Sequence, residues 1–410
     1  MANIRKRGES YEITVSAGYD STGKKLRRST TFRPDPLTAT GRQKAESVKD
    51  KEARAYAAEF EQQVKLGLVV GDYSMRFSDL AERYLQEYAF INLSRRTAEG
   101  YADYIKKVLI PKFGRCRIRD LCQQQLNIQT FFNDMTKPRA DGTQLAASTI
   151  RRRKNILSGI MTWAVNMQLI PRNPVQCIKS PREAFKEDSV MNFTAEELKR
   201  FIHFLEIDTS ISEQLKLFYI MAAFSGCRRG ELIALNWTDI DFDSNTIRVF
   251  KTASKIRGGI IIKETKTPKG RRIVNMPASV MQQAKQWRKH QIEWRLQMGT
   301  AWQGADNVFS QVDGKRMYPD TVSAKFTQII QKYNTACRTS EELPKITLHG
   351  LRHTAASILI NQHMDVAAVS KRLGHSRTSV TLDTYTHAIK EADKAAADLL
   401  EDLAKDAGIG

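Results

Sequence analysis

The pattern of apolar and polar positions predicts a small sheet at the start of the chain. Residues 11–15 alternate, with Tyr, Ile and Val on one face and polar residues on the other, as in a strand with one buried side. Two basic runs, 5–7 and 24–32, are expected to pair with this strand. Apolar residues at helical spacing then predict a helix over residues 41–66. Because so small a sheet is marginal alone, the helix is expected to cover it.

From residue 75 to residue 176 the apolar period is helical throughout. The predicted helices are marked by residues 77–85, 96–110, 126–135 and 148–168. The second is expected to stop at Pro111, because proline lacks the amide hydrogen that a helix interior needs. The last opens on four cations, Arg151, Arg152, Arg153 and Lys154. Since cations near a helix N-terminus oppose the macrodipole, this cluster is expected to contact phosphate rather than to add stability.

After a charged linker, the third part of the chain mixes both periods. The segment Thr194-Ala-Glu-Glu197 predicts a capping box before an apolar helical run. A second helical stretch covers residues 211–224. Residues 246–277 change to a strand pattern with a turn expected at 268–270, and helices return from Ser279.

Length and charge add two constraints. A chain of 410 residues exceeds the roughly 250–300 residues that one core supports. We therefore expect a mainly α fold with small β elements (α+β) in three domains, over residues 1–70, 75–176 and 185–410. The net charge of +20 and the pI near 9.7 favour a polyanionic partner such as nucleic acid. Charge alone would equally allow a ribosomal or other basic protein.

Cysteines and apolar runs exclude several classes. The five cysteines are scattered and form no Cys-x-x-Cys pair, so neither a disulfide framework nor a zinc ribbon is predicted. The N-terminus has no apolar core typical of a signal peptide. No run of about 18 apolar residues predicts a membrane span. We expect a cytoplasmic protein.

The residues that suggest chemistry lie in four short motifs. They are Arg228 in Ser-Gly-Cys-Arg-Arg-Gly-Glu, His349 and Arg352 in His-Gly-Leu-Arg, His375 after Leu-Gly, and Tyr385 in Asp-Thr-Tyr-Thr-His. Arginine offers a fixed fork of donors to phosphate oxygens. Histidine moves protons near neutral pH, and a tyrosine hydroxyl can act as a nucleophile. Together they suit chemistry on a phosphodiester.

Each motif alone has a simpler interpretation. Arg228 and Glu231, one helical turn apart, would usually be a surface ion pair worth about 0.3–0.5 kcal/mol. His349 and His353 could chelate zinc on one helix face, but a glycine stands where the zincin motif needs glutamate and no third ligand is evident. Tyr385 alone would be a packing residue of an amphipathic helix.

In this order and context the set resembles the tyrosine recombinase (phage integrase) family, closest to the integrases of conjugative transposons. The resemblance covers residues 75–395 strongly and 1–60 more weakly. It implies an active site of Arg228, Lys266, His349, Arg352, His375 and the nucleophile Tyr385, with Glu231 in support. Arg229, Lys263 and Lys269 are neighbouring competitors for two of these roles.

The resemblance also implies a mechanism and partners. Tyr385 would attack the scissile phosphate to give a 3′-phosphotyrosyl link, and a partner strand's hydroxyl would resolve it, through a Holliday junction, without ATP, metal or other cofactor. The implied partners are double-stranded attachment-site DNA, a homotetramer of the chain, an excisionase and a host DNA-bending protein. The resemblance implies that residues 1–70 bind arm-site DNA, residues 75–176 bind core-site DNA and residues 185–410 catalyse the reaction. A helix after Tyr385 would dock on a neighbouring protomer.

The N-terminal sheet bears the second group of candidate DNA contacts. They are Arg5, Lys6, Arg7, Lys24, Lys25, Arg27 and Arg28. A basic β-ribbon suits a DNA groove, although a solvated basic sheet has the same composition. This sheet favours an integrase over the alternatives of a Xer-like resolvase or a type IB topoisomerase-like enzyme. The complete set of active-site residues disfavours a DNA-binding regulator without catalysis.

Overall fold

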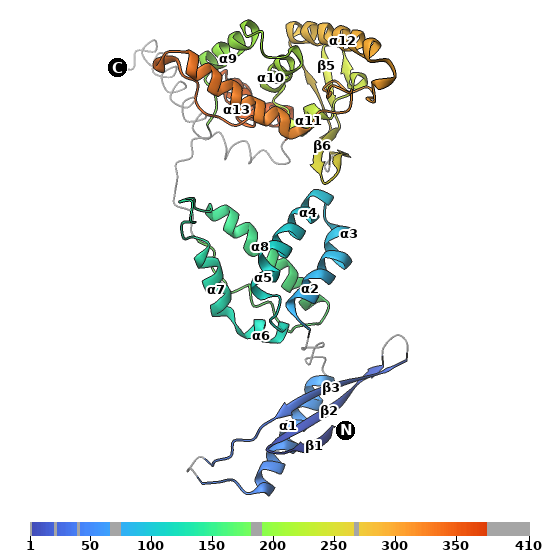
Figure 1. Ribbon diagram of the computed structural model, residues 1–410, viewed down its shortest axis with the longest axis vertical. Helices are drawn as coiled ribbons and strands as arrows, with labels where there is room; N and C mark the ends of the chain where they lie inside the picture. The colour runs from blue at the N-terminus through green and yellow to red at the C-terminus, as the bar shows by residue number, and fades with distance from the viewer. Residues whose placement is uncertain are drawn as a thin grey trace, which may run out of the picture. The chain divides into compact units, whose positions relative to one another are not determined.

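Figure 1 shows the chain as a computed structural model. The structure describes residues 2–19, 23–38, 42–65, 75–181, 191–265 and 270–374. Helices predominate, and the described strands form small antiparallel sheets, which confirms a mainly α fold with small β elements. The chain divides into two compact units, Met1–Phe185 and Lys186–Gly410. The first unit contains two separate hydrophobic cores, and its expected division near residues 70–75 stays a prediction.

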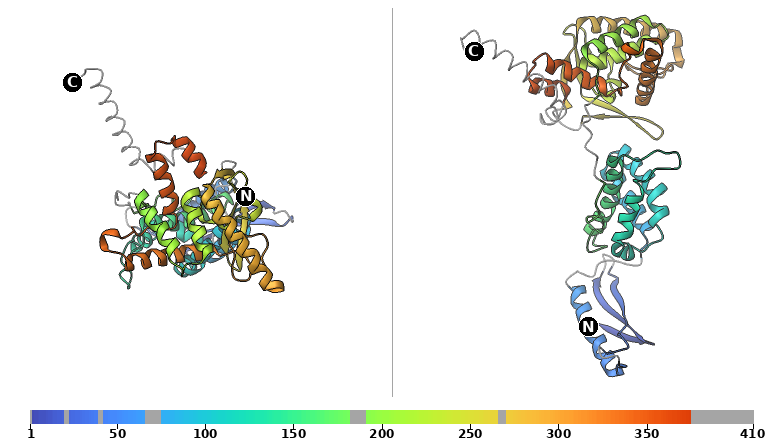
Figure 2. Two further views of the ribbon diagram at one scale, coloured as in Figure 1. Left: turned by 90° about the horizontal axis from the view of Figure 1, so that it is seen from above. Right: turned by 90° about the vertical axis from the view of Figure 1, so that its left-hand side faces the viewer.

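The predicted N-terminal sheet is present. Its strands are β1 (Asn3–Arg7), β2 (Ser10–Tyr19) and β3 (Lys25–Phe32), antiparallel in that order. Figure 2 shows helix α1 (Glu46–Lys65) lying along one face of the sheet. Ile13 and Val15 are buried there against Ala57 and Phe60, as their alternation predicts.

The next core is entirely helical. Its helices are α2 (Phe77–Arg83), η1 (Tyr84–Ala89), α3 (Phe90–Asn92), α4 (Arg95–Tyr104), η2 (Ile105–Leu109), α5 (Ile110–Phe113), α6 (Ile118–Gln123), α7 (Gln125–Asp134) and α8 (Ala147–Asn166). The prediction that Pro111 stops the second helix is wrong. A π-helical turn, η2, precedes the proline, which then lies in the first turn of α5, where its missing amide is tolerated.

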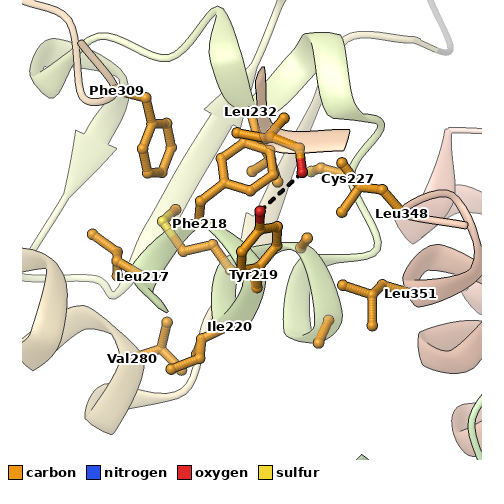
Figure 3. Packing of buried hydrophobic residues seen from close by; sticks show 14 of the residues in the cluster. Leu217, Phe218, Tyr219, Ile220, Cys227, Leu232, Val280, Phe309, Leu348 and Leu351 are labelled. Carbon is orange, nitrogen blue, oxygen red and sulfur yellow. Dashed lines mark hydrogen bonds between the residues drawn. The ribbon is translucent and has the colours of Figure 1, made fainter. Parts of the chain in front are cut away.

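The second unit is built on helices around one large core, with a smaller apolar cluster of Ala356, Ile360, Val369 and Leu373. The helices are α9 (Ala195–Ile207), α10 (Glu213–Ser225), α11 (Arg229–Ile233), η3 (Trp237–Asp239), α12 (Ala278–Met298), η5 (Gly299–Ala301), α13 (Pro319–Ala336), η6 (Thr339–Glu341), α14 (Gly350–Asn361) and α15 (Val366–Leu373). The predicted capping box is confirmed, with Thr194 and Glu197 bonded reciprocally. Figure 3 shows Phe218, Tyr219 and Leu232 in the core, where the Tyr219 hydroxyl donates to the Val322 carbonyl over 2.9 Å.

The strands of the second unit differ from the expected hairpin. They are β4 (Ile240–Asp241), β5 (Thr246–Val249) and β8 (Arg272–Asn275) in one sheet, and β6 (Lys251–Ile256) with β7 (Gly259–Glu264) in another. The hairpin turns at Arg257 and Gly258, where Gly258 adopts a positive φ of 85° that favours glycine in a tight turn. Strand β8 pairs with β5 instead, and the turn expected at 268–270 falls largely outside the described residues.

No helix among the described residues is both long and apolar enough to cross a membrane.

Candidate active site

The turn between α10 and α11 holds the first predicted arginine. Helix α10 ends at Ser225. The left-handed Gly226 that follows turns the chain back, and Arg228 then caps the short α11. Its amide donates to Glu231 Oε2 over 2.8 Å, and its Nη1 donates to Oε1 over 2.9 Å. The Glu231 side chain is 3 % exposed and that of Arg228 is 43 % exposed. The pair therefore joins a partly exposed arginine to a buried carboxylate. This excludes the interpretation of Arg228 and Glu231 as an ordinary surface ion pair.

Arg352, on α14, donates a hydrogen bond to the same turn. It is 2 % exposed, and its Nη1 donates to the Gly226 carbonyl over 2.8 Å. Its Nη2 is buried and has no hydrogen-bond partner in the described part of the chain. Burial, and then the nearby charge of Arg228, lower the pKa of Arg352 to about 10. A buried guanidinium with a donor to spare suits an anionic oxygen from a ligand.

His349 stands at the start of α14 beside both arginines. Burial lowers the pKa of His349 below its ordinary value, and the charges of Arg352 and Arg228 lower it further. The imidazole is therefore neutral at pH 7, with one nitrogen able to accept a proton and the other able to donate a hydrogen bond.

The neighbouring His353 packs edge-on against His349, with ring centroids 4.9 Å apart. Its pKa is lowered to about 4 by burial and by the nearby His349 and Arg352. No group of three histidine, cysteine, aspartate or glutamate side chains suited to a metal occurs among the residues described. The zinc alternative therefore finds no third ligand there.

The competing arginine, Arg229, points elsewhere. Its Nη1 donates to Ser323 Oγ over 2.7 Å and lies 3.5 Å from an Asp320 carboxylate oxygen, both on α13. Arg228 is thus the arginine of this pair that shares a neighbourhood with Arg352 and His349.

Arg272, on β8, belongs to this site although the sequence did not single it out. It is 7 % exposed, and its Nη2 donates to Glu231 Oε2 over 2.8 Å. Burial opposes the charge of Glu231, but the hydrogen bond and charge of Arg272, together with Arg228, hold its pKa below the usual value. The signal was strand alternation, which places Arg272 with the buried Val274 while Ile273 is 62 % exposed.

Three predicted residues, Lys266, His375 and Tyr385, lie outside the described residues, as does the docking segment after Tyr385, and their roles stay predictions. The chain immediately before His375 does reach the site. Arg228 Nη2 lies 3.4 Å from the carbonyl oxygen of Gly374, at the end of α15.

The basic residues of the N-terminal sheet fall on its two faces. The register places Arg5 opposite Glu12 and Arg27 opposite Ser16, on the face away from α1, and both arginines are exposed. Lys6 instead pairs with Glu46 of α1. We call the face away from α1 the open face. Arg5 and Arg27 are therefore better placed than Lys6 to contact a partner that binds the open face.

The four cations of α8 fall into two groups by their surroundings. Arg151 and Arg152 are exposed. The Arg153 guanidinium lies 5.3 Å from the centroid of the Tyr104 ring, and Lys154 Nζ donates to the Ile178 carbonyl over 2.9 Å. Arg153 and Lys154 thus contact their own domain, and the expected DNA contacts of the cluster stay predictions.

Comparison with known families finds two matches. Residues 191–392 match the phage integrase family, and residues 76–136 match the phage integrase N-terminal SAM-like domain. Among curated proteins, the chain is 27 % identical over 425 residues to a tyrosine recombinase XerC-like protein of Caldanaerobacter subterraneus subsp. tengcongensis, covering 98 % of both chains. It is 26 % identical over 398 residues to the ICEBs1 integrase of Bacillus subtilis, covering 96 % of this chain and 97 % of the relative.

Solved structures share the fold. The Tn1549 transposon integrase in complex with a circular intermediate DNA is 22 % identical, with a TM-score of 0.65 over 80 % of this chain and 100 % of that one. A lambda integrase dimer bound to a COC′ core site is 17 % identical, with a TM-score of 0.53 over 93 % of this chain and 94 % of that one.

Proposed function

Because this chain belongs to the phage integrase family of tyrosine recombinases, we propose that it is a site-specific DNA recombinase that integrates and excises a mobile element. One observation carries the proposal. Arg228 comes from the turn before α11, Arg352 and His349 come from the start of α14, and all three share one neighbourhood around the 226–231 turn. Two arginines can stabilise the negative charge that develops in phosphodiester exchange, and a neutral imidazole can accept a proton.

The chemistry follows from these groups. Tyr385 is the nucleophile: its oxygen forms a bond to the scissile phosphorus, and the 5′ oxygen leaves as a hydroxyl after Lys266 donates a proton. Negative charge grows on the non-bridging oxygens in the transition state. The partly exposed guanidinium of Arg228 and the spare Nη2 of Arg352 are suited to bind those oxygens.

His349 and His375 complete the proposed set. A neutral His349 accepts the Tyr385 proton or donates a hydrogen bond to a non-bridging oxygen, and His375 donates a second hydrogen bond. Since the phosphotyrosyl link keeps the energy of the broken bond, the hydroxyl of a second strand can replace the tyrosine without ATP.

The proposed partners extend this scheme. Two strand exchanges on two duplexes need four tyrosines, so the working species is a homotetramer on double-stranded attachment sites, assisted by an excisionase and a host DNA-bending protein. Its place is the bacterial cytoplasm, on the nucleoid. The basic N-terminal sheet favours this function over a Xer-like resolvase.

The first test is covalent trapping on a nicked suicide substrate, whose cleaved fragment diffuses away and leaves the adduct. The wild-type chain is expected to form a covalent protein–DNA adduct. Tyr385→Phe removes the nucleophilic oxygen but keeps the ring and the basic surface, so adducts should vanish while the DNA dissociation constant changes by less than about threefold. Adducts that persist in Tyr385→Phe would refute the assignment.

A further inference from the structure

The buried carboxylate of Glu231 has two cationic partners. Arg228 binds it through Nη1 and through its amide, and Arg272 donates from Nη2 to Oε2 over 2.8 Å. The side chains of Arg272 and Glu231 are only 5 % and 3 % exposed. A carboxylate that is removed from water to this extent loses its solvation energy, and opposite charge and hydrogen bonds must compensate for that loss. If Arg228 were the only cation beside Glu231, the carboxylate would bind almost all of its guanidinium.

Arg272 also binds the chain that leads to His375. Its Nε donates to the Arg372 carbonyl over 2.7 Å. Gly374 closes over the guanidinium so tightly, at φ 71°, that a Cβ there would lie 2.8 Å from Arg272 Nη1. The same Gly374 carbonyl lies 3.4 Å from Arg228 Nη2. One buried side chain therefore joins the 226–231 turn, β8 and the end of α15.

We propose that Arg272 is a positioning residue of the reaction: it neutralises Glu231 and fixes residues 372–374, so that the charge of Arg228 and the exposed part of its side chain stay available for the scissile phosphate. The division of labour is visible in exposure. Arg272 gives its donors to protein groups and is almost inaccessible, whereas the Arg228 side chain is 43 % exposed. This inference rests on the proposed function and adds a residue to it.

The test compares Arg272→Met with Arg271→Met on the nicked substrate. Arg271 is the adjacent cation, 54 % exposed and paired with Glu264, so its variant loses the same charge outside the buried network. At saturating DNA, Arg272→Met should lower the single-turnover rate of adduct formation by about 100-fold or more, with the DNA dissociation constant within about threefold of the wild type. Arg271→Met should keep the rate within about threefold. An unchanged rate in Arg272→Met would overturn the proposal.

A second substitution separates charge compensation from simple packing. In Arg272→Met the unpaired Glu231 captures Arg228, so adding Glu231→Gln should release it and raise the rate at least about tenfold over Arg272→Met. A packing role predicts a double variant no faster than Arg272→Met, and that result would overturn the proposal. Rates are taken per DNA-binding-competent molecule, and melting curves follow the folded fraction.

Arg272→Lys covers the case in which Arg272→Met does not fold. Lysine keeps one charge but cannot bond Glu231 and the Arg372 carbonyl together, so a partial loss of about tenfold is expected. A wild-type rate in Arg272→Lys would overturn the proposal. If the wild-type chain itself forms no adduct, the proposed function fails and the inference with it. If the wild type forms adducts and the Arg272 variants match it, the inference fails alone.

Discussion

At the scale of residues, the site depends on the geometry of guanidinium groups. Arg228 donates from Nη1 to Glu231 while its side chain stays 43 % exposed, and a planar fork with several donors can bond Glu231 and a ligand together. Lysine in its place offers one point charge, which Glu231 would capture.

Arg228→Lys is therefore expected to lower the single-turnover cleavage rate by about 100-fold or more, with little change in DNA affinity. Trapping on a nicked substrate measures the rate. Arg229→Lys is the matched control, since Arg229 bonds to Ser323 and Asp320 of α13, and it should cleave near the wild-type rate. The reverse ranking of the two variants would show that Arg229 binds the phosphate.

His353 predicts a dependence of stability on pH. Burial lowers its pKa from 6.5 to about 4, so the unfolded chain binds a proton below pH 6.5 that the native chain binds only near pH 4. Stability is thus full above pH 6.5 and falls as the pH drops toward 4, with His353 accounting for about 1–3 kcal/mol of the loss.

Urea midpoints at pH 7.5 and pH 4.5 measure this effect. His353→Gln should lose less stability between the two pH values than the wild type. His203→Gln, which changes an exposed histidine on α9, should lose as much as the wild type. Equal losses in His353→Gln and the wild type would contradict the prediction.

At the scale of elements, the N-terminal sheet is expected to act separately from catalysis. Deleting residues 1–70 removes seven candidate DNA-binding cations but no member of the proposed active set. Because independent domains act separately, the rate of core-site cleavage should stay within about a few-fold of the wild type. Recombination of full attachment sites with arm sequences should fall, because the second binding module is lost.

Point variants sharpen this test. Arg5→Ala with Arg27→Ala, on the open face, should weaken arm-site binding and flatten its salt dependence by about two phosphate contacts. Lys6→Ala should do less, because Lys6 already pairs with Glu46. If the double variant recombines arm-containing DNA like the wild type, the open face does not bind the arm site.

At the scale of the whole molecule, the active set consists of side chains that carry their own charge. Cleavage of the nicked substrate is therefore expected to proceed at an unchanged rate in excess EDTA without ATP, since the two arginines supply the charge that a metal would supply elsewhere. A strict requirement for magnesium in the cleavage step would favour a metal-dependent nuclease.

The sequence by itself determined the local features. Alternation at residues 11–15 predicted β2, Thr194 and Glu197 predicted their capping box, and short motifs singled out Arg228, Arg352 and His349. These features depend on neighbours within a few residues, so they can be read along the chain.

Only the tertiary structure decided the partners of Arg272, because they lie far away in the sequence: Glu231 is 41 residues distant and Arg372 is 100 residues distant. The same holds for the pairing of β8 with β5 and for the contact of Arg229 with Ser323, which is 94 residues distant. A buried charge takes whichever partner packing brings within hydrogen-bond distance, and packing between distant segments leaves no periodic trace in the sequence.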